Sequence, residues 1–307
     1  MKDMNKLINE FKFLGLQSTF IQDASMQNFT SFKVGGKSDL LVIPSSEDEL
    51  KTILQRFAQD GLPFIVMGKG TNILIRDGGY RGAIIRLEEA FSEIQVDGTQ
   101  LTAGAGASLS AVARAAMENG LAGIEFAAGI PGSLGGGTFM NAGAYDGEMK
   151  DIVREIRVLS HDGLQTRVVT NKMMDYGYRR SSLMATREIV LATTLNLAPG
   201  KREEITAKMK EFNDRRNLKQ PMDLPSAGSF FKRPEGYYAG KLIQDAGLKG
   251  LTIGGAQVSP KHSGFIVNVG GATAADIIAL MHVVQATVLD QFGVMIEPEV
   301  RIVGEEI

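Results

Sequence analysis

Apolar residues recur at helical spacing in several parts of the chain. After Ser46, leucine, isoleucine and phenylalanine positions repeat every three or four residues until Gly61, which is the period of one face of an α-helix. Ser46 and Glu49 have the spacing of a capping box, and Gly61 is a typical C-terminal stop. The same reasoning predicts helices at about 109–118 and 274–291 and, with mainly charged residues, from about 200 to 218.

Short runs rich in β-branched residues lie between these helices and predict strands. Two runs are interrupted by Asp-Gly, at Asp97-Gly98 and Asp162-Gly163, and this pair is the strongest local signal for a β-hairpin. Hairpins and helices are mixed without regular alternation, so the pattern favours an α+β fold over a parallel sheet. The other predicted strands cover 63–68, 73–87 (strand, turn, strand), 189–197 and 294–304.

The stretch from residue 123 to 148 differs from the rest of the chain. It is rich in glycine and holds no charge between Glu125 and Asp146. Its length would suit a membrane span, but glycine, proline and Asn141 make it too polar and too averse to helix for that role. We expect a buried loop with a short helix. The glycines have two interpretations, which are phosphate binding by bare backbone N–H groups and tight turns with close packing.

Three places resemble half of the dinucleotide-binding fingerprint G-x-G-x-x-G, namely Gly68-Lys-Gly70, Gly104-Ala-Gly106 and Gly135-Gly136-Gly137, and none completes it. Gly68-Lys-Gly70 is followed by Thr71-Asn72, and Gly104-Ala-Gly106 is followed by Leu109 where the third glycine should stand. The chain has no P-loop sequence either, so neither common phosphate-binding motif is complete. A dinucleotide would therefore need a scaffold other than the Rossmann fold.

Composition limits the chemistry that the chain can carry out. The 307 residues are enough for two domains, and a net charge of −2 gives no basic field for nucleic acid or an anionic membrane. We therefore expect small-molecule ligands and no obligate protein partner. The absence of cysteine excludes disulfides and thiolate sites, and three scattered histidines predict no metal centre. The amphipathic, charged N-terminus does not resemble a signal peptide, so a cytoplasmic protein is expected.

Six sequence blocks together carry a family resemblance. They are GKGTNILIRDGG at 68–79, GIPGSLGGGTFMNAGAYDGE at 129–148, YRRS at 178–181, GSFFKRP at 228–234, KHSGFIVN at 261–268 and EPEVRIVG at 297–304. With these blocks in this order, the chain resembles the UDP-N-acetylenolpyruvoylglucosamine reductases, flavoenzymes of peptidoglycan precursor synthesis. Only Ser182 to Arg187 separates the third block from the next predicted strand, so the resemblance is to the shorter subgroup, which lacks the segment with a lid tyrosine.

The resemblance implies an FAD-binding region of the vanillyl-alcohol-oxidase type over residues 1–198, in two α+β subdomains of about 1–90 and 91–198. A substrate-binding α+β domain would cover 199–307, and Ala198-Pro199-Gly200 interrupts the sequence pattern at this boundary. The resemblance further implies that NADPH reduces non-covalently held FAD. The flavin would then reduce the enolpyruvyl group of UDP-N-acetylglucosamine enolpyruvate to give UDP-N-acetylmuramate.

The resemblance implies that two glycine clusters, the loop 68–72 and the stretch 123–148, line the FAD. A neutral cradle of N–H groups can satisfy phosphate oxygens in a buried site. The resemblance therefore assigns the pyrophosphate to two loops and the neighbouring part of the cofactor to a third segment. The first loop is Gly68, Lys69, Gly70, Thr71 and Asn72, the second is Pro131, Gly132 and Ser133 with Gly136, and the third segment holds Asn141, Gly143 and Ala144.

Hydride addition to an enolpyruvyl group leaves negative charge beside its carboxylate, so the site needs a fixed positive group and a proton donor. The resemblance implies that Arg179 stabilises this charge, that Ser229 donates the proton and that Glu299 hydrogen-bonds the carboxylate. Without the resemblance, Arg179 would be interpreted as an exposed arginine and Ser229 as the start of a buried strand. Glu299 would lie on the solvated face of an edge strand, because Pro298 removes a backbone donor.

Other polar residues near these blocks are candidates for substrate contacts. For the cations among them, ordinary surface charge is the alternative interpretation. Arg233 departs from the asparagine that many family members have at this position, and Tyr145 could equally belong to the core. The candidates are Tyr178, Lys219, Lys232, Arg233, Lys241 and His262.

Two other functions remain open from the sequence. The first is an oxidase on the same FAD scaffold, although the chain lacks cysteine and its glycine-rich block lacks histidine, which are the usual residues for covalent flavin attachment. The second is a nucleotide-sugar sensor without catalysis, which would not need Arg179, Ser229 and Glu299.

Overall fold

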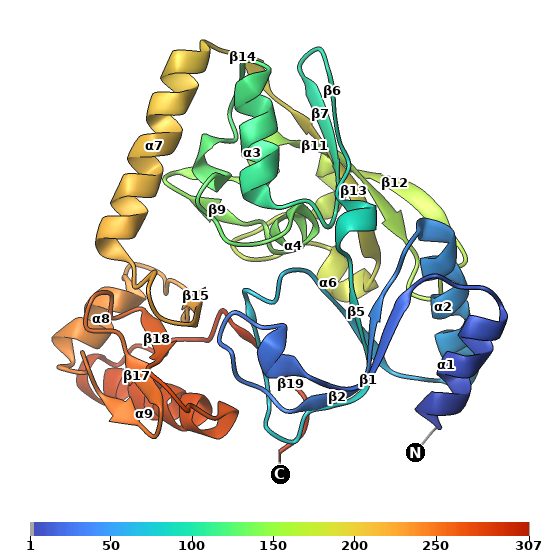
Figure 1. Cartoon of the computed structure of the whole chain (residues 1–307). Coiled ribbons are helices and arrows are strands. Elements are labelled where there is room, and N and C mark those ends of the chain that lie inside the picture. The colour runs from blue at the N-terminus through green and yellow to red at the C-terminus, as the bar shows by residue number, and fades with distance from the viewer. Residues whose placement is uncertain (1–2, 307) are drawn as a thin grey trace. The chain divides into compact units, whose positions relative to one another are not determined.

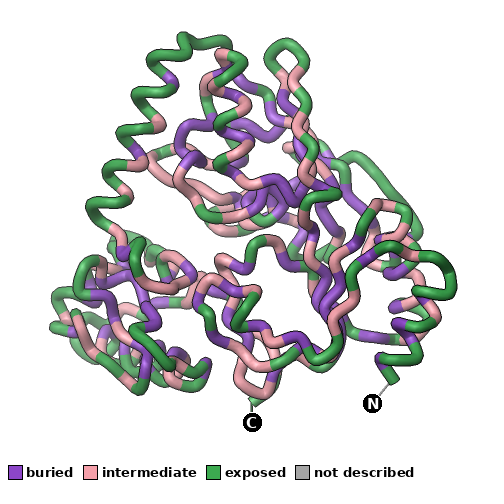
Figure 2. The backbone as a smooth tube through the Cα atoms, viewed as in Figure 1, coloured by how far each residue is buried: buried purple, intermediate pink, exposed green. Residues whose placement is uncertain are grey.

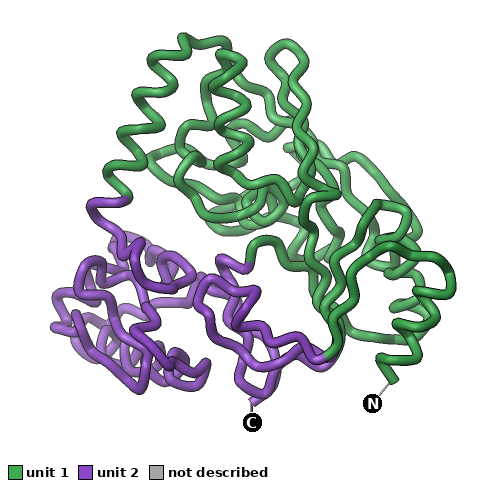
Figure 3. Tube along the Cα trace, viewed as in Figure 1, with its two compact units in different colours: residues 1–22, 40–69, 82–216 green, residues 23–39, 70–81, 217–307 purple. Residues whose placement is uncertain are grey.

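The computed structural model describes residues 3–306, which form two compact units (Figure 3). Among the described residues, unit 1 contains 3–22, 40–69 and 82–216, and unit 2 contains 23–39, 70–81 and 217–306. Each unit is therefore built from segments that are not consecutive in the sequence. The domain boundary predicted at residue 198, and the subdomain boundary predicted at about residue 90, stay predictions.

The first part of unit 1 combines two helices with a sheet. Helices α1 (Met4–Phe13) and α2 (Glu47–Asp60) pack together through Phe11 and Phe57, whose ring centroids are 6.3 Å apart. The sheet has the order β1-β2-β5-β3, and β3 pairs in parallel with β5. Its strands are β1 (Thr19–Ser25), β2 (Lys37–Ile43), β3 (Phe64–Met67) and β5 (Tyr80–Arg86), and β1, β2 and β5 each continue along the chain into a segment of unit 2.

The predicted start and stop of α2 are confirmed. The Ser46 hydroxyl accepts a hydrogen bond from the Glu49 N–H at 3.2 Å, and Gly61 ends the helix with a φ of 58°. The carboxylate of Glu49, however, does not return to Ser46 as a full capping box requires. It accepts the N–H groups of Gln17 and Ser18 at 2.8 Å each, so a tertiary contact replaces half of the predicted box.

The second part of unit 1 is a five-stranded antiparallel sheet in the order β12-β11-β13-β7-β6. Helix α3 (Leu109–Glu118) has the predicted bounds, and the short α4 (Leu134–Met140) contacts β13 and β7 (Figure 1). The strands are β6 (Ile94–Asp97), β7 (Gln100–Gly104), β11 (Val153–Leu159), β12 (Thr166–Thr170) and β13 (Ile189–Asn196).

Both predicted Asp-Gly hairpins are confirmed. Gly98 turns the chain between β6 and β7 with a φ of 58°, and Gly163 does so between β11 and β12 with a φ of 75°. These left-handed conformations are the ones that glycine adopts without steric cost. The mixture of hairpins and helices confirms the α+β class.

Short elements connect the strands of unit 1, and a long helix ends it. Helix α7 (Arg202–Lys219) is exposed along most of its length (Figure 2), and Ile205 and Phe212 are its buried residues. The short elements are η2 (Glu89–Phe91), β8 (Leu121–Ala122), η3 (Glu125–Ala127), β9 (Gly143–Ala144), β10 (Gly147–Glu148), α5 (Met149–Ile152), η4 (Asn171–Met174), α6 (Leu183–Thr186) and β14 (Ala198–Pro199).

Unit 2 has its own core, drawn from all three of its segments. Phe32, Leu74 and Phe230 are fully buried there, and the rings of Phe32 and Phe230 lie 6.2 Å apart. The sheet β15-β18-β17-β16 is antiparallel, and a second sheet pairs β4 with β19 in parallel. Its elements are η1 (Met26–Asn28), β4 (Ile73–Ile75), β15 (Ser226–Ser229), α8 (Ala239–Asp245), β16 (Thr252–Ile253), β17 (Ala256–Val258), β18 (Phe265–Asn268), α9 (Ala274–Phe292) and β19 (Arg301–Val303).

The predicted strand over 294–304 is wrong for most of its length, since only Arg301–Val303 forms a strand. Pro298 forms an isolated bridge to Phe231, and the N–H of Glu299 donates to the carbonyl of Phe230 at 2.8 Å. Beyond Val300 the chain pairs with β4 instead. The segment thus changes partners halfway, which interrupts a continuous ladder. Among the described residues, no helix is both long and apolar enough to cross a membrane.

Candidate active site

The two glycine clusters meet inside unit 1. A Cβ added to Gly68 would lie 2.2 Å from the Oγ of Ser133, so only glycine allows the loop after β3 to pass this close to the second cluster. Ser133 is buried and caps α4 by accepting the N–H of Gly136 at 3.3 Å. The sequence suggested that the clusters share a site, and in unit 1 they do lie together.

Several glycines of the second cluster serve packing. A Cβ on Gly135 would lie 2.7 Å from the Cβ of Ala105, and one on Gly137 would lie 3.2 Å from Leu109. The N–H groups of Leu134 and Gly135 donate to the carbonyls of Ala107 and Ala105. The start of α4 is therefore held by the protein, and both interpretations of the glycines apply to different residues of the cluster.

The loop that continues from Gly70 to Asn72 belongs to unit 2. The Gly70 carbonyl accepts the N–H of Ser31 at 3.0 Å and its hydroxyl at 3.2 Å, and the Asn72 carbonyl accepts the N–H of Arg301 at 3.2 Å. The N–H groups of Gly70, Thr71 and Asn72 have no acceptor among the described residues. The carbonyl groups of this loop are bonded to the protein, whereas successive N–H groups stay available. An anion-binding nest has this arrangement.

A tight hairpin follows α4. Asn141 ends α4 in the left-handed region with a φ of 48°, and β9 and β10 pair Gly143 with Glu148 and Ala144 with Gly147. The side chain of Asn141 is fully buried and bonded within the protein. Any contact of Asn141 with a cofactor would therefore come from its backbone, while Gly143 and Ala144 are half-buried.

Arg179 lies at the tip of a two-residue turn. Gly177 and Arg180 exchange backbone hydrogen bonds of 3.1 and 3.2 Å, which leaves Tyr178 and Arg179 between them. Arg179 has a φ of 53°, a left-handed conformation that is costly for a long side chain. Its guanidinium donates to the carbonyls of Asn141 and Gly143 at 3.4 and 3.3 Å and lies 4.9 Å from the centre of the Tyr178 ring.

The half-buried guanidinium of Arg179 is thus held by three groups of unit 1, two of which belong to the glycine-rich hairpin. That this hairpin orients the arginine was not anticipated from the sequence. A backbone carbonyl has no signature in the sequence, so nothing in the residues alone could have revealed it.

Ser229 and Glu299 come together in unit 2. Ser229 is exposed at the end of β15, and the next residue accepts the Glu299 N–H through its carbonyl at 2.8 Å. The side-chain amide of Asn72 donates to the Glu299 carbonyl at 3.3 Å. Two predicted catalytic residues and one predicted cofactor residue therefore lie on adjacent segments of one unit, although they are far apart in the sequence.

The predicted substrate residues of unit 2 differ in their surroundings. Lys232 pairs with Glu297 at 2.9 Å and lowers the pKa of that carboxyl, while Lys241 pairs with Asp245 on α8. The guanidinium of Arg233 lies 4.0 Å from the centre of the Tyr238 ring. The two lysines are thus engaged with carboxylates, as the surface-charge alternative expects.

His262 is the most enclosed of the predicted substrate residues in unit 2. Its Nδ1 accepts the N–H of Gly264 at 3.1 Å, so in the neutral form the ring proton is on Nε2. Burial lowers the pKa of His262, and the positive charges of Lys249 and Lys219 lower it further. Lys249 was not anticipated from the sequence, because an isolated lysine in a loop carries no distinguishing pattern.

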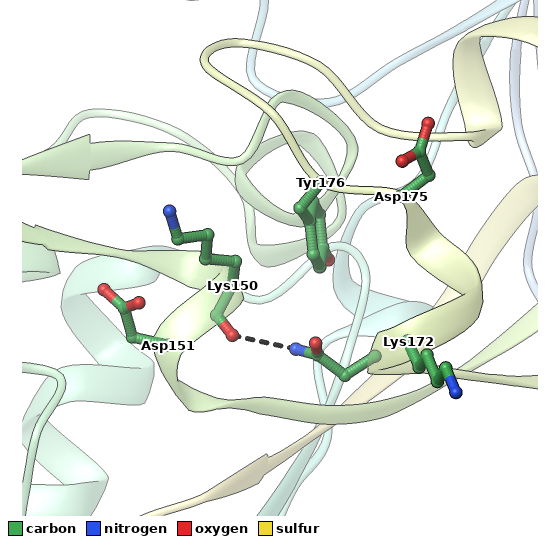
Figure 4. Close-up of a pocket in the computed structure, with 6 residues that line it drawn as sticks. Lys150, Asp151, Lys172, Asp175 and Tyr176 are labelled. Atoms are coloured by element: carbon green, nitrogen blue, oxygen red, sulfur yellow. Dashed lines mark hydrogen bonds between the residues drawn. The ribbon is translucent and has the colours of Figure 1, made fainter.

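A separate pocket lies in unit 1 and contains none of the predicted site residues. It has a volume of about 360 Å³ and is open to solvent (Figure 4). Lysines and aspartates of opposite charge line it, so it has no single charge preference. Its lining residues are Lys150, Asp151, Asn171, Lys172, Asp175 and Tyr176.

Comparisons with known proteins agree with this picture. Residues 38–168 match the family model of an FAD binding domain, and residues 220–303 match the model of the UDP-N-acetylenolpyruvoylglucosamine reductase C-terminal domain. The chain is 47% identical over 300 residues to the UDP-N-acetylenolpyruvoylglucosamine reductase of Caldanaerobacter subterraneus, which covers 98% of this chain and 99% of the relative. The enzyme of the same name from Clostridioides difficile is 45% identical and both chains are covered completely.

Solved structures give the same result for the fold. The crystal structure of UDP-N-acetylenolpyruvylglucosamine reductase from Thermus caldophilus aligns with a TM-score of 0.80 at 34% identity, covering 94% of this chain and 99% of the other. An alkyldihydroxyacetonephosphate synthase shares only the fold of part of the chain, with a TM-score of 0.50 at 16% identity over 64% of this chain and 41% of the other. The FAD-binding region thus has the expected vanillyl-alcohol-oxidase-type fold. The chain belongs to the UDP-N-acetylenolpyruvoylglucosamine reductase family and is an FAD-dependent oxidoreductase.

Proposed function

We propose that this enzyme uses NADPH to reduce UDP-N-acetylglucosamine enolpyruvate to UDP-N-acetylmuramate, a step of peptidoglycan precursor synthesis. The observation that carries the proposal is the arrangement in unit 2, where Ser229 and Glu299 occupy adjacent segments beside Asn72. A proton donor and a carboxyl group next to a phosphate-binding loop are what reduction of an enolpyruvyl nucleotide sugar requires.

The residues of the loop 68–72 fit FAD. The N–H groups of Gly70, Thr71 and Asn72, which have no acceptor among the described residues, suit a pyrophosphate. A bound FAD would supply the redox chemistry that links hydride transfer from NADPH to reduction of the substrate. We assign the loop 68–72 and the turn at Pro131, Gly132, Ser133 and Gly136 to its phosphates, and Asn141, Gly143 and Ala144 to its neighbouring parts.

Arg179 is proposed to bind the substrate carboxylate. Its charge is permanent, and its guanidinium can form two parallel hydrogen bonds with a carboxylate. Because carbonyl groups and Tyr178 already restrict the side chain, little reorganisation is needed when negative charge develops on the substrate. The arginine therefore stabilises the charged intermediate more than the substrate, which is how it would accelerate the reaction.

Ser229 and Glu299 are proposed to complete the reaction. The exposed hydroxyl of Ser229 donates a proton to the carbon beside the carboxylate, which is a strong base at this stage. Glu299 is proposed to hydrogen-bond the substrate carboxylate. Tyr178, Lys219, Lys232, Arg233, Lys241 and His262 are the proposed contacts with the rest of the nucleotide sugar. A cytoplasmic location without protein or nucleic-acid partners belongs to the same proposal.

Anaerobic spectroscopy of the purified yellow protein tests the function. NADPH should bleach the flavin absorbance, and addition of the enolpyruvyl sugar nucleotide should restore it. If oxygen restores the colour rapidly and the sugar nucleotide does not, the protein is an oxidase. A colourless protein that takes up no FAD would support the non-catalytic sensor instead.

A further inference from the structure

Asn141 is connected to more of the site than its place at the end of α4 requires. The residue is fully buried in unit 1 and left-handed, with a φ of 48°. Its Nδ2 donates to Glu148 Oε2 at 2.6 Å and to the Gly177 carbonyl at 3.0 Å, and its Oδ1 accepts the Lys150 N–H at 2.9 Å. All three polar positions of the side-chain amide are therefore used.

Asn141 forms hydrogen bonds with the turn that carries Arg179 at two places. The side chain of Asn141 holds the Gly177 carbonyl, which also accepts the Arg180 N–H and so closes the turn. The backbone carbonyl of Asn141 accepts from Nη1 of Arg179 at 3.4 Å. One residue thus fixes both the base of the turn and the guanidinium at its tip.

We propose that Asn141 is a positioning residue that orients Arg179 toward the substrate carboxylate. The inference rests on the function proposed above. Asparagine suits the position because it tolerates the left-handed conformation and supplies both donors and an acceptor. Aspartate has the same shape without the donors, and glycine keeps the backbone conformation without the side chain.

The two half-reactions separate this role from a purely structural one. In Asn141→Gly and Asn141→Asp we expect reoxidation of the flavin by the enolpyruvyl substrate to slow by about 10- to 100-fold, as for a small misplacement of a catalytic group. Any contact of Asn141 with FAD comes from its backbone, whose left-handed conformation both variants can keep, so reduction by NADPH should slow much less than the substrate step. Stopped-flow absorbance measures both rates in the FAD-loaded protein.

A mutant cycle with Arg179→Lys tests whether Asn141 acts through the arginine. Residues that act as one unit are not additive, so in the Arg179→Lys background Asn141→Gly should slow the substrate step by less than about threefold. Asn171→Asp is the matched control. Its side chain also donates to two carbonyls, those of Lys150 at 2.8 Å (dashed in Figure 4) and Val153 at 2.7 Å, and neither acceptor belongs to the turn.

A spectroscopic measurement without turnover completes the test. The Nε–H signal of Arg179 in the nitrogen NMR spectrum, identified by its loss in Arg179→Lys, should shift or broaden in Asn141→Gly and remain in Asn171→Asp. Equal slowing of both half-reactions, independent effects in the cycle, or loss of FAD from both Asn141 variants would overturn the inference. If the wild type does not reduce the enolpyruvyl substrate at all, the proposed function fails first and the NMR result still decides the positioning role.

Discussion

At the scale of single residues, Arg179 combines an unfavourable backbone with a well-held side chain. A left-handed conformation costs about 1–2 kcal/mol for a residue with a Cβ, and such strain is typical of functional positions. The sequence Tyr-Arg-Arg-Ser gave no sign of this conformation, because it depends on the exchange of hydrogen bonds between Gly177 and Arg180. Sequence motifs identified the residue, whereas only the fold explains its orientation.

Arg179→Gly should separate stability from activity. Relief of the strain offsets the lost contacts of the side chain, so the free energy of unfolding in urea should stay within about 1 kcal/mol of the wild type. The substrate half-reaction should fall by at least about 100-fold, because a charge that stabilises the transition state is lost. Arg180→Ala is the control, since it removes only an exposed ion pair with Asp175. A large loss of stability in Arg179→Gly would show that the arginine serves the fold.

Ser229→Ala should affect one half-reaction. Reduction of the flavin by NADPH needs no proton from this hydroxyl, so its rate should be nearly unchanged. The substrate step should slow by about 10²- to 10⁴-fold, the usual effect of losing a general acid. Ser226→Ala, at the other end of β15, serves as control. Equal slowing of both steps would assign the serine a structural role.

At the scale of elements, the sequence predicted the ends of several helices correctly but did not predict which strands pair. Helices α2, α3 and α9 begin and end within a residue or so of the predicted positions, because their caps are local. The strand predicted over 294–304 was mostly wrong, since it changes partners from the segment 230–232 to β4. Such a change depends on residues far away in the sequence, which a local pattern cannot reveal.

The packing glycine of α4 gives a prediction about stability. In Gly135→Ala the new methyl group would lie 2.7 Å from the Cβ of Ala105, so the substitution should lower the free energy of unfolding by about 1–3 kcal/mol. Ala105→Gly in the double variant should recover much of this loss, as urea unfolding of the three variants would measure. If the single variant is as stable as the wild type, the close approach at α4 is not required.

The capping box of α9 should make the free energy of unfolding depend on pH. Hydrogen bonding from the Thr273 N–H lowers the pKa of Asp276 below its ordinary value of 3.8. Protonation therefore favours the unfolded chain, and the stabilisation is complete above about pH 4 and lost as the pH falls through the lower, folded-state pKa. Asp276→Ala should cost about 1 kcal/mol at pH 7 and almost nothing at strongly acidic pH.

Asp290 offers the matched control on the same helix. It lies in the last turn of α9, where the helix dipole disfavours a negative charge. Asp290→Ala should therefore leave stability at pH 7 unchanged or slightly higher. Unfolding in urea at several pH values compares the two variants, and a pH-independent cost of Asp276→Ala would contradict the assigned cause.

At the scale of the whole molecule, neither unit is a continuous piece of chain. The core of unit 2 needs Phe32 and Leu74 as well as Phe230. The fold class and the order of functional regions were predictable from the sequence blocks. That the segments 23–39 and 70–81 belong to unit 2 was not predictable from the sequence. Their assignment depends on long-range contacts such as the pairing of Arg301 with Ile73 across 228 residues.

The fragment 199–307 should consequently fail to fold by itself. It lacks β4, which is the partner of β19, and three buried residues of the unit 2 core, Phe32, Val34 and Leu74. Circular dichroism during heating should show no cooperative transition for the fragment and a clear one for the full chain. A sharp transition with dispersed NMR signals from the fragment would contradict this expectation.

The pairing of β4 with β19 also has a consequence for synthesis in the cell. Arg301 leaves the ribosome 228 residues after Ile73, which at ordinary translation speeds is a delay of about 10 to 45 s. During this time the apolar strand Ile73–Ile75 has no partner, and an unpaired strand edge favours aggregation. Strand β4 can therefore complete its sheet only after Arg301–Val303 have left the ribosome, whereas the segments of unit 1 have all been synthesised by residue 216.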